Sequence, residues 1–249
     1  MSQKVALVTG AAAGIGAACA QRLAQDGMAI GVLDLDEERC AGTVGAIRAA
    51  QGRAIALGAD ISKRVQVQAA VAKLRGAFGP VTVLVNNAGM AEFIPFEDIT
   101  DEKWDTMFAV NVRGAFIVTQ EVLPDMKAAK WGRIVNISSS SAQTGSVAQV
   151  HYSASKGAII TFTRSLAQLL GQYGVTVNNI PPGSVMNTIM SEANRHHFTI
   201  KPEALLESLP VRRLGEPQDI ANACAWLCLE ASSYVTGQTI GVNGGRVVS

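Results

Sequence analysis

The stretch "VTGAAAGIGAA" (residues 8–18) decides the fold class of this chain. It joins a short, β-branched apolar run at 5–10 to a stretch with helical character. Gly10, Gly14 and Gly16 permit a tight turn and a close backbone approach, and the free N–H groups of the following helix can face a pyrophosphate. The spacing is GxxxGxG rather than the commoner GxGxxG, so the glycines alone fit a ligand-free turn as well. Their position after a first strand favours a nucleotide site.

The same rhythm of short apolar runs and longer helical patterns continues along the chain. The runs are hydrophobic on both faces, which is typical of strands inside a parallel sheet. The expected strands are 5–10, 28–34, 53–60, 81–87, 132–139, 174–180 and 237–245. The expected helices are 15–26, 36–50, 62–77, 101–129, 152–171 and 216–229. We therefore predict an α/β fold, in which one doubly wound parallel sheet of the Rossmann type forms a single domain over residues 1–249.

One region interrupts this rhythm. Residues 184–213, "SVMNTIMSEANRHHFTIKPEALLESLPVRR", form an insertion of helical character after the sixth expected strand. Ligands of wound sheets bind outside the carboxyl ends of the strands, and the insertion leaves from such an end. We expect it to form a lid over a substrate. The adjacent His196 and His197 fit surface or lid residues better than a metal site or a catalytic base.

The composition narrows the class of partner. The formal net charge is +1 and no basic run exceeds two residues, which argues against nucleic acid or an anionic membrane as a partner. No window approaches 18 uninterrupted apolar residues, so we expect a cytoplasmic protein that acts on a small molecule. The four cysteines (Cys19, Cys40, Cys224 and Cys228) lack CxxC spacing and are expected to be buried thiols rather than metal ligands or disulfides.

Asp34 ends the second expected strand, 18 residues beyond Gly16. A carboxylate at this place can accept hydrogen bonds from the ribose hydroxyls of an adenosine. The alternative is a helix N-cap, but Asp36 serves that role as well or better. A ribose contact by Asp34 would favour NAD, because the 2′-phosphate of NADP would meet a like charge. Neither Ala11–Ala13 nor the residues directly after Asp34 supply a cation, although Arg39 could swing toward the site.

A second pair of polar residues stands out in "HYSASKGAII" (151–160). Tyr152 and Lys156 are four residues apart and therefore share one face of the expected helix. Taken alone, the pair fits an ordinary buried helix with a lysine that extends to solvent. Beside a nucleotide turn, it favours a phenol that exchanges protons under the influence of a nearby positive charge.

At this point the chain resembles a family, the short-chain dehydrogenases/reductases, over essentially its full length. The resemblance is carried by "TGAAAGIG" (9–16), "NNAG" (86–89), "NVRG" (111–114), Ser139, "YSASK" (152–156), "PPG" (181–183) and "TGQTIGVNGG" (236–245). Their order and spacing together are highly specific. The resemblance implies hydride transfer between a nicotinamide cofactor and a carbonyl or secondary alcohol, usually by a homotetramer.

The resemblance also implies the site residues. The catalytic group would be Asn111, Ser139, Tyr152 and Lys156, where Ser139 stands 13 residues before Tyr152 within a serine run. The cofactor contacts would be Gly10, Ala13, Gly14, Ile15, Gly16, Asp34, Leu35, Asp60, Ile61, Asn87, Ala88, Gly89, Tyr152, Lys156, Pro182, Gly183, Val185 and Thr188. After "PPG" the chain departs from the family pattern, because Asn187 stands where a threonine is usual and Thr188 follows it. Which of the two contacts the carboxamide stays open.

We therefore expect an NAD-dependent alcohol dehydrogenase or carbonyl reductase. A tyrosine normally titrates near ~10, so Tyr152 needs about 4 kcal/mol of phenolate stabilisation to act near neutral pH. Lys156 and an oxidised nicotinamide would supply it, Ser139 would bond the substrate oxygen, and Asn111 would hold a water. A 3-oxoacyl-thioester reductase is the main alternative, although such enzymes often carry a basic residue where this chain has Ala11–Ala13. A nucleotide-sensing protein without catalysis is a remote one.

Overall fold

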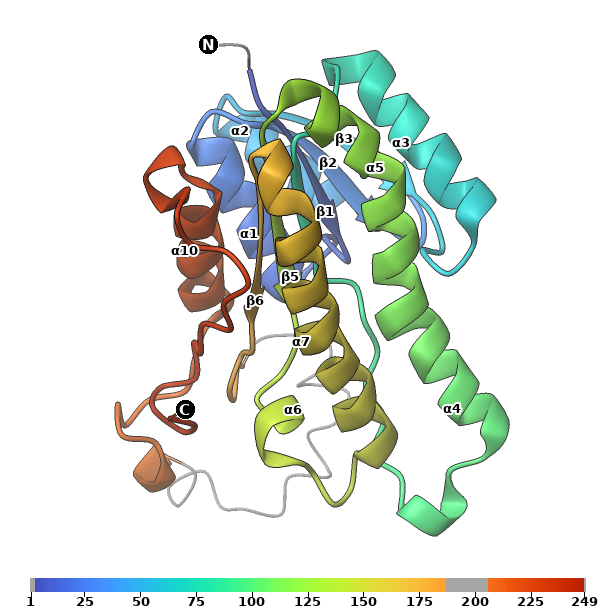
Figure 1. The fold of residues 1–249 in the computed structure, drawn as a ribbon, viewed down its shortest axis with the longest axis vertical. Helices are drawn as coiled ribbons and strands as arrows, with labels where there is room; N and C mark the ends of the chain where they lie inside the picture. Colours follow the sequence, from blue (N-terminus) through green and yellow to red (C-terminus); the bar gives the residue numbers. More distant parts are fainter. Residues whose placement is uncertain (1–2, 187–205, 249) are drawn as a thin grey trace.

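The structure is a computed structural model that describes residues 3–186 and 206–248. Its centre is a six-stranded parallel sheet with the order β3-β2-β1-β4-β5-β6 (Figure 1). The strands are β1 (Val5–Thr9), β2 (Ala29–Asp34), β3 (Arg53–Gly58), β4 (Val83–Asn86), β5 (Gly132–Ile137) and β6 (Val175–Ile180). This is the order of the Rossmann fold, as predicted.

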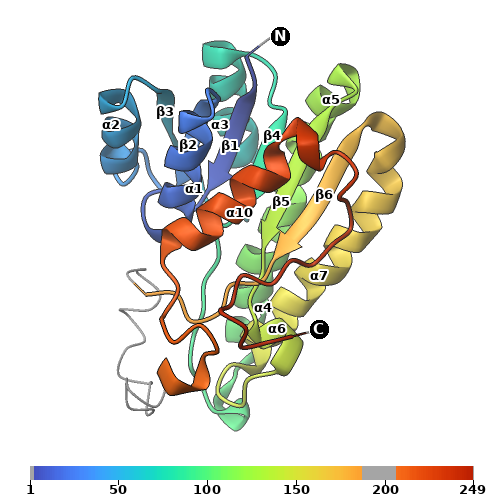
Figure 2. The ribbon, with the colours of Figure 1, turned by 90° about the vertical axis from the view of Figure 1, so that its left-hand side faces the viewer.

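Helices cover both faces of the sheet (Figure 2). They are α1 (Gly14–Gln25), α2 (Ala41–Ala49), α3 (Arg64–Phe78), α4 (Asp101–Phe108), α5 (Ala115–Ala129), α6 (Ser141–Thr144), α7 (Val150–Leu170) and α10 (Pro217–Cys228), with short 3-10 turns η1 (Phe96–Asp98), η3 (Gly171–Tyr173) and η5 (Glu230–Ser232). Alternate β1 residues serve opposite layers: Ala6 and Val8 pack in the core under α1 and α10, and Val5 and Leu7 in the core under α3, α5 and α7. All four cysteines are buried and free, as expected.

The sheet changes direction at β1. Its neighbours are β2 on one side and β4 on the other, with Ala6 in register with Ile30 and with Val83. The connections that follow β1 and β4 therefore leave the sheet toward opposite faces, and a crevice opens beyond their carboxyl ends. The glycine turn follows β1 and the "NNAG" segment follows β4, so both border this crevice.

The expected helix over 101–129 is one continuous run with an irregular middle. A π-helical turn, η2 (Ala109–Gly114), joins α4 to α5 and carries Asn111. Such turns insert one extra residue into a helix and occur often at functional sites. The sequence pattern gave no sign of it.

The seventh predicted strand, 237–245, is wrong as a continuous strand. The segment makes single bridge pairs with β6 and the residues after it, at Thr239 with Asn179 and at Val242 with Pro182. Side chains supply other bonds that a main-chain ladder would make: the Gln238 N–H donates to Asn178 Oδ1 at 3.1 Å. The segment therefore follows β6 with an interrupted ladder and does not form a regular strand.

No helix in the part of the chain that the structure describes is long and apolar enough to cross a membrane.

A polar network lies inside the layer between the sheet and α5 and α7. Asn86 on β4 donates to Thr119 of α5 at 3.0 Å and to Asn136 on β5 at 2.9 Å. Asn136 in turn donates to Thr163 of α7 at 2.8 Å. Buried polar groups need such partners, and this network fixes α7, which carries Tyr152, against two central strands.

Candidate active site

The glycine turn after β1 is held tightly because it has no room for side chains. Gly10 has a φ of +62°, and a Cβ there would lie 2.7 Å from the Cα of Ala88. At Gly16 a Cβ would lie 2.2 Å from the carbonyl oxygen of Gly10. Only glycine fits either position, so the turn folds back on α1 and leaves the first N–H groups of that helix uncovered.

The turn is also bonded to the segment after β4. The Asn87 side chain donates to the carbonyls of Thr9 at 2.9 Å and Gly10 at 3.0 Å. In return, the hydroxyl of Thr9 accepts from the main-chain N–H groups of Asn87 and Ala88, each at 3.0 Å. These bonds keep the two sides of the crevice at a fixed separation.

A cavity of about 510 Å³ lies in this crevice. Its lining includes most of the predicted cofactor contacts: Gly10, Ala13, Gly14, Ile15, Asp34, Leu35, Asp60, Ile61, Asn87, Ala88 and Gly89. Leu33, Arg39, Ala59, Met90, Ala91 and Val110 complete the described lining. Arg39 was considered from the sequence, whereas the other five were missed, although most of them adjoin predicted residues in the chain.

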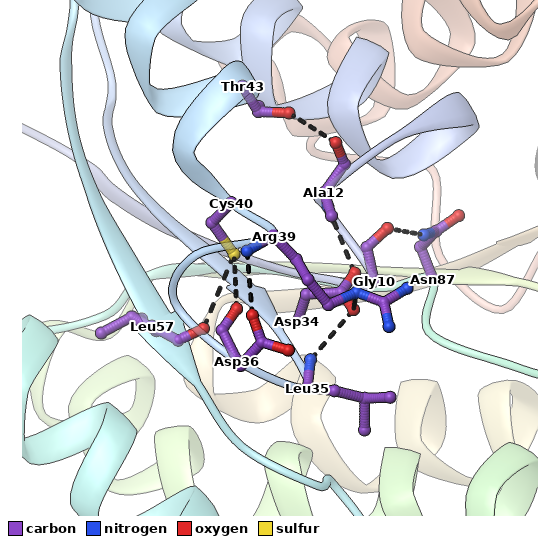
Figure 3. Close-up of polar contacts among 10 residues, drawn as sticks. All are labelled: Gly10, Ala12, Asp34, Leu35, Asp36, Arg39, Cys40, Thr43, Leu57 and Asn87. Atoms are coloured by element: carbon purple, nitrogen blue, oxygen red, sulfur yellow. Dashed lines mark hydrogen bonds and ion pairs between the residues drawn. The ribbon is translucent and has the colours of Figure 1, made fainter.

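Asp34 bridges the glycine turn and the end of β2 (Figure 3). Its Oδ2 accepts from Ala12 N–H at 3.3 Å, and its Oδ1 accepts from Leu35 N–H at 2.9 Å. Asp36 does not cap α2 either: the N-cap of this helix is Cys40, without a side-chain bond, and Asp36 Oδ1 accepts from the Arg39 N–H at 2.9 Å in the turn before it. The carboxylate of Asp34 therefore faces the cavity and is not needed as a helix cap.

Arg39 forms an ion pair with Asp34. Its Nε lies 3.2 Å from Asp34 Oδ1, and the arginine side chain is 45% exposed against 14% for the aspartate (Figure 3). Farther along the lining, Asp60 accepts from the Ser62 main chain at 2.9 Å and from its hydroxyl at 2.7 Å, which orders the approach to α3.

Tyr152 and Lys156 lie on the first turns of α7 and are both buried. Burial raises the pKa of the Tyr152 phenol above its usual 10.0, and a hydrogen bond from Ser139 opposes this in part. Burial lowers the pKa of Lys156 from 10.5 to about 8. The Lys156 ammonium donates to the Ile137 carbonyl at 3.0 Å and lies 5.9 Å from the centre of the tyrosine ring. In the chain alone, desolvation thus outweighs the expected effect of Lys156 on the phenol.

Lys156 also connects these buried groups to the cavity. A Cβ on Gly89, which lines the cavity, would lie 3.1 Å from Lys156 Nζ and 3.0 Å from Asn111 Oδ1. The absence of a side chain at Gly89 therefore lets the lysine and the asparagine reach the cavity wall.

Ser139 and Asn111 have different surroundings. Ser139, just after β5, accepts from the Ser141 main chain at 3.2 Å and from its hydroxyl at 2.9 Å. Asn111 is buried: its amide donates to Met90 O and Ser155 Oγ, each at 3.0 Å, and its Oδ1 accepts from Met90 N–H at 2.8 Å. The side chain of Asn111 thus holds the segment after β4 against α7. Its suggested role in holding a water stays a prediction.

The other predicted contacts among the described residues lie outside the cavity lining. Gly16 packs against the glycine turn, while Tyr152 and Lys156 stand behind the wall. Pro182, Gly183 and Val185 follow β6, where Gly183 N–H donates to Val242 O at 3.2 Å and Val185 pairs with Gly215. Asn187 and Thr188, the pair of histidines and most of the expected lid lie outside the described residues.

Several known proteins match this chain over nearly its full length. A family model described as short chain dehydrogenase matches residues 4–198. The chain is 41% identical to nodulation protein G of Azospirillum brasilense, over 98% of each chain. It is 37% identical to acetoacetyl-CoA reductase of Cupriavidus necator, also over 98% of each. A crystal structure of a variant of actinorhodin polyketide ketoreductase with NADPH superposes with a TM-score of 0.93 at 33% identity, covering 99% of both chains.

Proposed function

Because the chain belongs to the short-chain dehydrogenase/reductase family, we propose that it transfers hydride between NAD(H) and a secondary alcohol or the corresponding ketone. The observation that carries the proposal is the position of Tyr152 and Lys156: they are buried together behind the Gly89 end of a cavity whose other end presents Asp34. We propose further that it works as a cytoplasmic homotetramer, the assembly that the family resemblance implies.

The residues around the cavity fit a dinucleotide. The volume of about 510 Å³ lies within the usual range for small-molecule sites, and Gly10 and Gly16 leave the start of α1 open to a pyrophosphate. Asp34 would accept from the adenosine ribose, and Lys156 would reach the nicotinamide ribose beside Gly89. When bound, the nicotinamide ring supplies the hydride acceptor or donor.

The protein's own part is to hold and move a proton at the substrate oxygen. Tyr152 would accept the alcohol proton through its phenolic oxygen, or donate it in the reverse direction, while Ser139 orients the same oxygen. Since burial raises the pKa of Tyr152, the phenolate needs a positive charge close by. Lys156 is positively charged below pH 8 and can contribute about 4 kcal/mol at ~4 Å and an effective dielectric of 20.

A second candidate is a reductase of 3-oxoacyl thioesters. The observation that favours it is the similarity to a full-length relative, the acetoacetyl-CoA reductase of Cupriavidus necator, at 37% identity. Both candidates use the same proton transfer at Tyr152 and differ in what the carbonyl is attached to.

One assay separates the candidates: oxidation of NADH and of NADPH by the purified protein over matched ketones and 3-oxoacyl thioesters. Turnover of free ketones with NADH supports the first candidate. Selective turnover of thioesters supports the second, and a strong preference for NADPH would contradict the ribose role of Asp34. Dinucleotide binding without turnover of any substrate would instead indicate a nucleotide-sensing protein.

A further inference from the structure

The serine run after β5 places two hydroxyls side by side. Ser139 follows the last residues of β5, and Ser141 is the first residue of α6. The hydroxyl oxygen of Ser141 lies 2.9 Å from Ser139 Oγ, and the main-chain nitrogen of Ser141 lies 3.2 Å from the same atom. Ser139 therefore receives two hydrogen bonds from a single residue.

These two bonds limit what the hydroxyl of Ser139 can do. A serine hydroxyl has one O–H donor and two acceptor positions. The main-chain N–H of Ser141 can only donate, so it fills one acceptor position. One acceptor position and one proton remain, and they are divided between the Ser141 hydroxyl and the reaction centre.

The reaction centre needs the proton. Ser139 makes a side-chain hydrogen bond with Tyr152, and this bond lowers the pKa of the phenol while burial raises it. A hydrogen bond lowers the pKa of a phenol when it favours the phenolate, which requires Ser139 to be the donor. A substrate carbonyl oxygen gains negative charge as hydride arrives, so it also calls for a donor.

The Ser141 hydroxyl must therefore donate to Ser139. If Ser139 donated to Ser141 Oγ instead, a lone pair would face the Tyr152 phenolate, and the two would repel each other. When Ser141 donates, the hydroxyls form a chain in one direction, from Ser141 through Ser139 to Tyr152. Consecutive hydrogen bonds of this kind polarise one another, so each strengthens the next.

We propose that Ser141 is a positioning residue, which donates its hydroxyl proton to Ser139 and so directs the proton of Ser139 at the Tyr152 phenolate and the substrate oxygen. The proposal rests on the proposed function, since it assumes proton transfer at Tyr152. Ser141 acts only through Ser139. Its main-chain N–H holds the Ser139 oxygen in place, and its hydroxyl sets the direction of the bond.

Ser141→Ala tests this, because it keeps the main-chain N–H and removes the hydroxyl. In alcohol oxidation kcat should fall about 3- to 10-fold, the effect of one neutral hydrogen bond, while KM and dinucleotide affinity change by less than ~2-fold. The pH at which kcat reaches half its maximum should move upward by about 0.5 unit, because the phenolate loses support. Ser141→Thr restores a hydroxyl and should restore both quantities.

Ser140→Ala is the matched control. Ser140 belongs to the same serine run, but its main-chain N–H donates to Pro182 O at 2.9 Å and its side chain does not cap α6. Both kcat and its pH dependence should therefore stay unchanged. A lower kcat without a shift in pH dependence would indicate a structural role for Ser141 and overturn the proposal.

Two further outcomes would overturn it: an unchanged kcat in Ser141→Ala, or a loss that Ser141→Thr does not rescue. Tyr152→Phe separates this inference from the proposed function. If Tyr152→Phe retained turnover, the proposed function would fail and the inference with it. If Tyr152→Phe lost turnover while Ser141→Ala matched the unaltered protein, the inference alone would fail.

Discussion

The two ends of the cavity are built in opposite ways. At the glycine turn, main-chain atoms and short side chains are bonded to one another, and the charged groups are partly exposed. At α7, Tyr152 and Lys156 are buried, and burial shifts the pKa of each toward its uncharged form. The hydrogen bonds of the chain therefore hold the first end in a fixed shape before any ligand binds. At the second end, the charged forms of Tyr152 and Lys156 become favourable only when further charges bind nearby.

This difference between the two ends predicts which property a substitution at each end should change. A change at the glycine turn should alter shape and affinity, and charge effects there should be weakened by solvent and salt. A change at α7 should alter proton transfer and the dependence on pH. Four substitutions test the division.

The largest effect is expected at the buried end. Tyr152→Phe keeps the ring and its packing but removes the proton carrier, so turnover should fall by at least ~100-fold, the lower end for acid–base catalysis. Affinity for the dinucleotide, measured by calorimetry, should survive. Tyr234→Phe, on a fully exposed tyrosine, is the control. Near-normal turnover in a folded Tyr152→Phe protein would remove the phenol from the mechanism.

The second largest effect is expected at the glycine turn, where a steric clash alone should disturb binding. In Gly16→Ala the new Cβ would meet the Gly10 carbonyl oxygen at 2.2 Å. The backbone must shift, which should lower the free energy of unfolding by about 3 kcal/mol, the upper range for overpacking, and weaken dinucleotide binding. Gly45→Ala on α2 has open space around its Cβ and should be neutral or slightly stabilising in urea denaturation. Equal behaviour of the two variants would show that the turn tolerates a side chain.

The lowered pKa of Lys156 should make the free energy of unfolding depend on pH. Its pKa is about 8 in the folded chain and 10.5 ordinarily, so the unfolded chain binds more protons between these values and stability rises with pH. From pH 7 to pH 9.5 this contributes about 2 kcal/mol to the free energy of unfolding. Lys156→Met should lose that rise in urea denaturation, and Lys73→Met, on an exposed ion pair with Glu37, should keep it. A slope that Lys156→Met leaves unchanged would refute a lowered pKa.

The smallest effect concerns a single bond to the glycine turn. Thr43 of α2 donates its hydroxyl to the Ala12 carbonyl at 3.0 Å (Figure 3). Thr43→Val should lower the free energy of unfolding by about 1 kcal/mol and weaken dinucleotide binding slightly. Thr176→Val removes a buried hydroxyl that has no partner, so thermal denaturation should show little loss. A larger loss at Thr176 would reverse this ranking.

The sequence predicted what local patterns determine. The doubly wound sheet and the turn after β1 follow from the alternation of apolar runs with helical patterns and from glycines that are close in the chain. The π-helical turn at Asn111 and the network from Asn86 to Thr163 were not predicted. These features depend on partners such as Thr119 and Asn136, 33 and 50 residues from Asn86. Spacing in one sequence carries no record of such pairs.

The bonds between Asn87, Ala88 and Thr9 also have a consequence for how the protein is made. They join positions 78 and 79 residues apart, so the glycine turn gains its supports only after β4 has been synthesised and has docked beside β1. A nascent chain that ends before residue 83 carries the whole glycine motif but lacks the atoms that hold its shape. Such long-range closure slows folding, and the dinucleotide can first recognise this chain only when about a third of it has left the ribosome.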